Sequence, residues 1–257
     1  MIEFIDTHAH LYDESFDGDF EEVVGKIKRD GVIKCIFPAI DSTTFQRQED
    51  AAAKCGDFVS QAIGLHPTSV GANWKEELDF VFDKVDEGNY VAIGEIGLDG
   101  YWSREFMDRQ KEVFREQLKL AYRLGLPVII HVREAAEETF QVLDSLGDEI
   151  PKGVFHAFSG SVETWERIRR YGKFMVGIGG VVTYKNAGVA RTVEQIPLED
   201  ILLETDCPYL TPVPFRGRRN DSGNLVYIAE KIAQIKECSL EEVANVTTEN
   251  AKRMFGL

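Results

Sequence analysis

The sequence predicts a closed (β/α)8 barrel, an α/β fold in which eight parallel strands alternate with helices. Eight apolar stretches of strand length follow one another, and their starts lie 21 to 37 residues apart. Segments with helical periodicity separate them. This spacing suits a strand, a helix and two short loops. We therefore expect one barrel domain over residues 1–257, with its active site at the carboxyl ends of the strands.

The expected strands are runs rich in β-branched and aromatic residues that turn-forming residues bound. An open doubly wound sheet is the alternative for so many strands, and its nucleotide site would want a GxGxxG turn. Gly177-Ile178-Gly179-Gly180 lacks that spacing, so the closed barrel is favoured. The expected strands begin near Ile2, Val32, Phe58, Tyr90, Pro127, Gly153, Phe174 and Ile201.

Helices are expected where apolar residues recur every 3.6 positions. Two such runs stop at Gly31 and Gly125, and glycine is the usual residue just beyond a helix. Ser239-Leu240-Glu241-Glu242 has capping-box spacing, so a C-terminal helix should begin there. The expected helices lie at about 20–30, 42–54, 76–87, 113–124, 134–146, 161–171, 187–195 and 225–236.

The composition limits the classes of partner. The formal net charge is −15, so the molecule as a whole repels polyanions and must bind any phosphate group locally. The four cysteines form no CxxC pair, which favours reduced structural thiols over a zinc knuckle or disulfides. No apolar run approaches the ~20 residues of a membrane span. We predict a soluble, cytoplasmic protein with no membrane association and no obligate protein partner.

The five histidines are the most informative residues, because each falls at the end of an expected strand. A lone histidine is more often a core or surface group than a functional one. Strand ends converge at the mouth of a barrel, however, so five such residues together predict a shared site. They are His8, His10, His66, His131 and His156.

Asp6-Thr7-His8-Ala9-His10 predicts a metal site at the end of the first strand. Residues i and i+2 of a strand share a face, so the two imidazoles point the same way. Imidazole is a common ligand of Zn²⁺, Mn²⁺ and Fe²⁺, and a carboxylate often orients it. Asp6 shares that face and is a candidate for the orienting role. The alternative is an HxH that merely ends a strand.

Two carboxylates sit in otherwise apolar strands, where an unpaired charge is costly to bury. Glu95 lies within Val91–Asp99, and Asp206 ends the eighth strand. A bound cation would remove the cost at both positions. Glu204 shares the face of Asp206 and either supports the ligands or pairs with an arginine, of which we favour the first.

Four histidines and two carboxylates exceed what one tetrahedral ion needs. They suit two ions about 3.5–4 Å apart that Glu95 bridges, an arrangement that activates water for hydrolysis. Asp206 is then the natural general base, with Glu95 as the second catalytic residue. Mixed imidazole and carboxylate ligands accept Mg²⁺, Mn²⁺, Zn²⁺ or Fe²⁺.

The chain resembles the TatD-type metal-dependent deoxyribonucleases of the amidohydrolase superfamily in several short segments, which occur along the sequence in the same order as in the family. The final Thr248-x-Asn250-Ala251-x-x-x-Phe255 fits as well. The matching segments are Asp6-Thr7-His8-Ala9-His10-Leu11, Gly64-Leu65-His66-Pro67, Gly94-Glu95-Ile96-Gly97-Leu98-Asp99, His131-Val132-Arg133, His156-Ala157-Phe158-Ser159-Gly160, Glu204-Thr205-Asp206-Cys207-Pro208 and Pro214-Phe215-Arg216-Gly217-Arg218-Arg219-Asn220.

The resemblance implies a barrel that binds two divalent ions and hydrolyses phosphodiester bonds. It implies a 3′–5′ exodeoxyribonuclease whose substrate is the 3′ end of DNA. The ligands that it implies are the residues already selected on chemical grounds. They are His8, His10, Glu95, His131, His156 and Asp206.

Further residues are candidates for binding the substrate phosphate. Arg133 follows His131 by two residues and should share its inward face, and His66 could donate to the same group. The loop after the eighth strand adds Arg216, Arg219 and Asn220, although such a charge run can equally be a solvated surface.

The rim loops depart from the family pattern and bear on the choice of substrate. Phe215 stands where the family often has histidine, Gly100 follows Asp99, and residues 221–224 replace an acidic residue followed by proline. Tyr101 and Trp102 could stack on a terminal base or be rim aromatics.

Two other functions remain open on the same barrel. One is two-metal hydrolysis of a small ester, lactone or amide. The other is a non-catalytic barrel that binds metal or phosphate.

Overall fold

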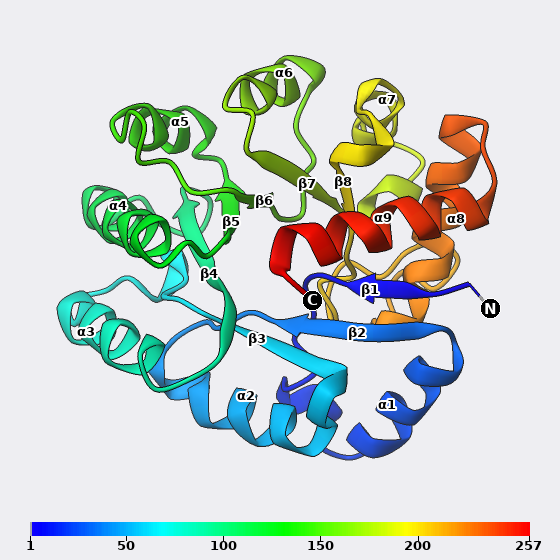
Figure 1. The fold of residues 1–257 in the computed structure, drawn as a ribbon, viewed down its shortest axis with the longest axis horizontal. Helices are drawn as coiled ribbons and strands as arrows, with labels where there is room; N and C mark the ends of the chain where they lie inside the picture. Colours follow the sequence, from blue (N-terminus) through cyan, green and yellow to red (C-terminus); the bar gives the residue numbers. More distant parts are fainter. Residues whose placement is uncertain (1) are drawn as a thin grey trace. The chain divides into compact units, whose positions relative to one another are not determined.

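The computed structural model describes residues 2–257 and contains eight strands hydrogen-bonded in chain order in one sheet (Figure 1). The pairs whose register is defined are all parallel. β8 lies against β1, where Thr7 N donates to Leu203 O at 3.1 Å. This order, with the last strand against the first, confirms the predicted (β/α)8 barrel.

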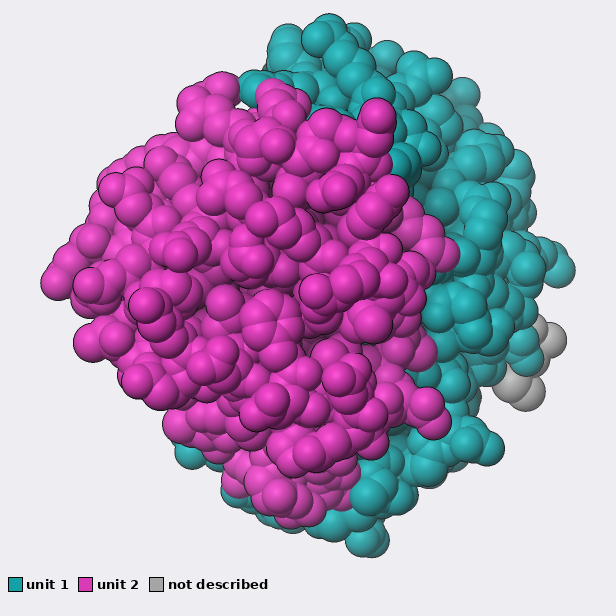
Figure 2. All heavy atoms as spheres, turned by 60° about the vertical axis from the view of Figure 1, so that its left-hand side comes forward, with its two compact units in different colours: residues 1–37, 51–60, 157–257 teal, residues 38–50, 61–156 magenta. Residues whose placement is uncertain are grey.

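The chain divides into two compact units (Figure 2). Unit 1, drawn in teal, contains residues 1–37, 51–60 and 157–257, and unit 2, in magenta, contains residues 38–50 and 61–156. The single domain expected over 1–257 stays a prediction.

Unit 1 contains four whole strands, of which β1 pairs with β2 and β7 pairs with β8. These are β1 (Phe4–Asp6), β2 (Val32–Phe37), β7 (Phe174–Ile178) and β8 (Ile201–Leu203). Its α-helices are α1 (Phe20–Arg29), α6 (Val162–Arg170), α7 (Val189–Gln195), α8 (Leu225–Lys236) and α9 (Leu240–Phe255). Its short 3-10 helices are η1 (Glu14–Phe16), η2 (Gly56–Phe58), η4 (Gly180–Thr183), η5 (Leu198–Asp200) and η6 (Ser222–Asn224).

Unit 2 contains β4 (Tyr90–Asp99), β5 (Val128–Arg133) and β6 (Gly153–Phe155), which pair in that order. β3 (Val59–Ile63) begins in unit 1, and its residues 61–63 pair with β4. α2 (Ser42–Cys55) is also shared between the units, whereas the remaining elements lie in unit 2. They are α3 (Trp74–Val85), α4 (Met107–Leu124), α5 (Ala136–Asp144) and the 3-10 helix η3 (Pro67–Ser69).

The sequence predicts these elements closely, because apolar periodicity and helix caps are local signals. Every expected strand is present and starts within two residues of its expected position. α4 ends at Leu124, just before Gly125 with its φ of 69°, and the Ser239 side chain accepts from Glu242 N as the capping box predicts. α9 packs on β1 and β8. There, the Asn250 side chain donates to Leu198 O and Ile201 O, both at 2.9 Å.

The backbone beyond β1 stays extended between β2 and β8, and this fixes the first histidine pair. Ala9 N donates to Ile36 O at 3.0 Å, and His10 N donates to Cys207 O at 2.8 Å. Asp206 N in turn donates to His8 O at 2.9 Å. The alternation of an extended chain therefore sends both imidazoles to one side, as the HxH spacing predicts.

All four cysteines are free thiols, in agreement with the prediction of structural thiols. Burial raises the pKa of Cys35 and of Cys207 well above the ordinary value of a thiol, so both stay neutral near pH 7. In the described part of the chain, no helix has the length and apolarity needed to cross a lipid bilayer.

Candidate functional site

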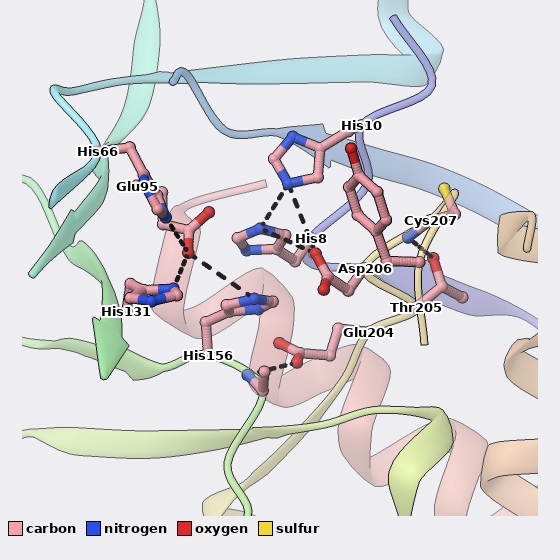
Figure 3. A network of polar contacts seen from close by, with 12 residues as sticks. His8, His10, His66, Glu95, His131, His156, Glu204, Thr205, Asp206 and Cys207 are labelled. Atoms are coloured by element: carbon pink, nitrogen blue, oxygen red, sulfur yellow. Dashed lines mark hydrogen bonds and ion pairs between the residues drawn. The ribbon is translucent and has the colours of Figure 1, made fainter. Parts of the chain in front are cut away.

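In unit 1, His8, His10 and Asp206 form a cluster that we call the Asp206 group (Figure 3). The two Nε2 atoms face each other at 3.0 Å, and they lie 3.7 and 3.5 Å from Oδ1 of Asp206. The side chain of His8 is 1% exposed and that of Asp206 is 16% exposed. Two imidazole nitrogens and a carboxylate directed at one another are the donor set of a divalent-cation site.

The backbone supports the position of Asp206. Its φ is 56°, a left-handed conformation that is uncommon outside glycine and is concentrated at functional sites. Asp6, the predicted orienting carboxylate, acts on the main chain nearby. It accepts from His8 N at 3.2 Å, from Thr205 N at 3.0 Å and from the Thr205 hydroxyl at 2.5 Å. Its complete burial raises its pKa to about 7.

In unit 2, Glu95 is surrounded by three histidines, and we call these four residues the Glu95 group (Figure 3). Oε1 of Glu95 lies 2.8 Å from Nδ1 of His131, 3.5 Å from Nε2 of His66 and 3.8 Å from Nε2 of His156. The Glu95 side chain is only 3% exposed. A buried carboxylate oxygen close to imidazole nitrogens fits a site for cations, because carboxylate oxygens and imidazole nitrogens are common ligands of divalent ions.

Three of the five histidines have one ring nitrogen held by the protein, which leaves the other nitrogen for the site. Nδ1 of His10 lies 2.9 Å from the Tyr12 hydroxyl. Nδ1 of His66 accepts from Thr68 N at 3.1 Å, so its Nε2 carries the proton in the neutral ring. Outer-shell partners of this kind orient metal ligands.

His131 has the strongest partner of the three. Its Nε2 lies 2.9 Å from Oδ2 of Asp99 while its Nδ1 faces Glu95. Burial, the largest influence, lowers the pKa of His131, but its bonds to Asp99 and Glu95 raise it overall to about 9. Sequence reasoning gave Asp99 no role. The signal was present, since Glu95, Gly97 and Asp99 share one face of an extended strand.

Glu204 is buried beside β7 and anchors the chain that follows β6. Its Oε1 accepts from Ala157 N at 2.6 Å, and its side chain fills the space that Gly177 leaves. A Cβ at Gly177 would stand 2.0 Å from Oε2 of Glu204. The carboxylate thus fixes the residue after His156, while its support of the metal ligands stays a prediction. The requirement for glycine at position 177 is visible only in the structure.

The predicted phosphate-binding residues separate into two kinds. Arg133 and Arg216 are exposed, and their guanidinium groups lie over aromatic rings, Arg133 over Tyr101 at 3.6 Å and Arg216 over Tyr184 at 4.4 Å. Stacking leaves the edge of a guanidinium available to phosphate oxygens.

Arg219 and Asn220 are instead engaged within unit 1. Arg219 bonds both oxygens of Asp19 and the carbonyl of Ser15. The Asn220 side chain is 0% exposed, and it donates to Thr205 O at 2.9 Å and to Tyr209 O at 2.7 Å. The structure therefore corrects the prediction for Asn220. This amide holds the loop after β8 and is inaccessible to a substrate phosphate, because burial and main-chain partners occupy it.

Comparison with known proteins places these clusters in a family. A family model described as TatD related DNase matches residues 5–256. The chain belongs to the TatD family. This confirms the resemblance found in the sequence motifs, and it covers both histidine–carboxylate clusters.

Relatives of this TatD family member align along their whole length. An uncharacterized metal-dependent hydrolase, YabD of Bacillus subtilis, is 42% identical over 97% of this chain and 98% of its own. Deoxyribonuclease TATDN3 of Homo sapiens is 33% identical, covering 99% and 95%. The crystal structure of YjjV, a TatD homologue from Escherichia coli K12, superposes with a TM-score of 0.91 at 31% identity, covering 100% and 99% of the two chains.

Proposed function

We propose that this TatD family member is a divalent-metal-dependent phosphodiesterase that removes nucleotides from the 3′ end of DNA. The observation that carries the proposal is the environment of Glu95, whose buried Oε1 has three imidazole nitrogens within 3.8 Å. Burying a carboxylate is costly unless positive charge lies beside it, and divalent ions held by these nitrogens would supply that charge. The printed names of YabD, a metal-dependent hydrolase, and of TATDN3, a deoxyribonuclease, support the reaction and the substrate.

The two clusters supply the ligands for two ions in this proposal. Bound divalent ions would lower the pKa of water to give a nucleophile near neutral pH and stabilise negative charge on the phosphoryl oxygens. Nitrogen and oxygen donors in this mixture accept Mg²⁺, Mn²⁺ or Zn²⁺. The ligands would be His8, His10, Glu95, His131, His156 and Asp206.

Asp206 is the general base in this reaction. Its side chain is more exposed than that of Glu95, 16% against 3%, so a proton that it accepts can pass to solvent. The carboxylate would take the proton of the attacking water while the backbone holds it in place. Glu95, which is 3% exposed and lies among three histidines, would hold the ions instead of exchanging protons with solvent.

Arg133 and His66 would bind the substrate phosphate. The proton on Nε2 of His66 makes this ring a hydrogen-bond donor, and the guanidinium of Arg133 matches two phosphate oxygens. Arg216, on the loop after β8, adds a positive charge for the adjoining phosphate. These local cations matter because the formal net charge of −15 repels DNA elsewhere. The cytoplasmic location and the absence of an obligate protein partner stay predictions from the sequence.

The test is a time course on a single-stranded oligonucleotide labelled at its 5′ end. The protein receives Mg²⁺, Mn²⁺ or Zn²⁺ in turn, and Asp206→Asn is the matched control. We expect a ladder that shortens from the 3′ end, that disappears with chelator and that Asp206→Asn does not produce. A full-rate ladder in chelator would overturn the metal mechanism. An intact oligonucleotide together with rapid cleavage of small esters would overturn the choice of DNA.

A further inference from the structure

Two large aromatic side chains are exposed side by side on the loop after β4. Trp102 is 71% exposed and Tyr101 is 48% exposed, and their ring centroids lie 5.1 Å apart in an edge-to-face arrangement. Exposed aromatic area is costly in water and is typical of binding surfaces. Single exposed apolar residues occur elsewhere, but a positively charged side chain lies over the rings of this pair.

The cation is Arg133 at the end of β5. Its Cζ lies 3.6 Å from the centroid of the Tyr101 ring and 5.6 Å from that of Trp102. Within residues 2–257 the Arg133 guanidinium makes no ion pair or hydrogen bond. Arg104, which lies with the two rings on the loop after β4, is instead paired with Glu138. The stacked guanidinium therefore keeps its five donors for a ligand, and the ring below holds its plane.

Asp99 fixes this loop to the Glu95 group. Its Oδ1 accepts from the backbone N of Tyr101 at 2.9 Å and of Trp102 at 3.1 Å, while its Oδ2 lies 2.9 Å from Nε2 of His131. Gly100 N donates to Arg133 O at 2.8 Å. A Cβ at Gly100 would stand 2.6 Å from Glu134 O, so glycine permits this close approach. The backbone that carries the two rings is thus held by Asp99, which also contacts the candidate metal ligand His131.

We propose that Tyr101, Trp102 and Arg133, here called the aromatic platform, bind the terminal nucleotide next to the cleaved phosphate. The exposed rings stack on the base, and the guanidinium binds the phosphate that is cleaved. Stacking of this kind tolerates every base, because each base has a π face. This inference rests on the proposed function and adds the residues that recognise the terminal nucleotide.

Binding is measured first, on the intact protein with Mg²⁺ and a short phosphorothioate oligonucleotide that resists cleavage. We expect Trp102→Ala and Tyr101→Ala each to weaken binding by about 5- to 150-fold, the range for loss of one base–aromatic stack. Tyr122→Ala is the matched control, because Tyr122 is 47% exposed on α4 in the same unit. Its affinity should equal that of the unchanged protein.

The second arm removes the base and leaves the backbone. An oligonucleotide with an abasic 3′ end should bind to the unchanged protein as weakly as the normal oligonucleotide binds to Trp102→Ala. The abasic change should then have little further effect in that variant. For cleavable single-stranded DNA, KM should rise in Trp102→Ala while kcat is retained. Equal affinity for normal and abasic ends would overturn the platform.

The two proposals fail separately. If stacking is measured as expected but no oligonucleotide is cleaved with any ion, the DNase function fails and the platform stands as a nucleotide-binding surface. If DNA is cleaved normally and neither aromatic variant changes affinity or KM, the platform fails and the function stands.

Discussion

The Asp206 group and the Glu95 group use the same residue types in different surroundings. Glu95 is 3% exposed and one of its oxygens is approached by three imidazoles, whereas Asp206 is 16% exposed on a left-handed backbone beside two. A carboxylate enclosed by rings is suited to hold cations, and a carboxylate open to water is suited to exchange protons. The difference in burial therefore supports the different tasks that we propose for these two carboxylates.

The largest expected effect separates those tasks. Asp206→Asn should lower kcat by about 10²- to 10⁴-fold with bound metal retained, because the amide keeps an oxygen but accepts no proton. Glu95→Gln should lower both kcat and bound metal, since the amide has neither the charge nor a second equivalent oxygen. Initial rates and metal content per chain by mass spectrometry measure the two effects. Full metal content in Glu95→Gln would contradict the difference between the groups.

The two groups also differ in the side chains that hydrogen-bond their histidines. Asp99 is an ionised partner of His131, and Tyr12 is a neutral partner of His10. Asp99→Asn should weaken metal binding by about 10- to 100-fold, the usual cost of losing such a partner. Tyr12→Phe should cost less, because a neutral hydrogen bond is weaker than a charge-assisted one. Metal titrations measure both, and a larger loss in Tyr12→Phe would reverse the order.

A substitution at Gly177 tests whether the stability of the protein depends on the fit of the Glu204 side chain into the space that this glycine leaves. Gly177→Ala would place a Cβ 2.0 Å from the carboxylate, displace it and break its bond to Ala157 N. The free energy of unfolding should fall by at least about 1 kcal/mol. Gly188→Ala is the control, because nothing lies within 4 Å of its Cβ position. Denaturant unfolding compares them, and equal stabilities would show that Glu204 moves at no cost.

The smallest effect is expected at Arg219, which is exposed and already paired with Asp19. Asp19→Asn should change the free energy of unfolding by about 0–1 kcal/mol, as is usual for surface ion pairs. The Arg219 bonds hold the pKa of Asp19 below its ordinary value. The pair therefore stabilises the fold above about pH 4, and this stabilisation is lost as the pH falls through the lowered pKa of Asp19.

Arg219→Gln should leave KM for DNA nearly unchanged, whereas Arg133→Gln should raise it. Equal KM increases would restore Arg219 as a phosphate ligand.

Much of the fold could be predicted because its signals are local. Strands and helices follow from apolar periodicity, and the ends of α4 and α9 follow from Gly125 and Ser239. The HxH pair is likewise a local pattern, since strand alternation alone makes two imidazoles share a face.

The sequence by itself determined the order of the elements and the residues able to bind a metal, because residue type and short-range spacing carry that information. Only the tertiary structure decided the partners of those residues. It placed Asp99 on His131, Glu204 in the space at Gly177, and Asn220 inside the loop after β8. These contacts join residues that a local pattern does not relate, so burial and hydrogen bonding across strands had to assign them.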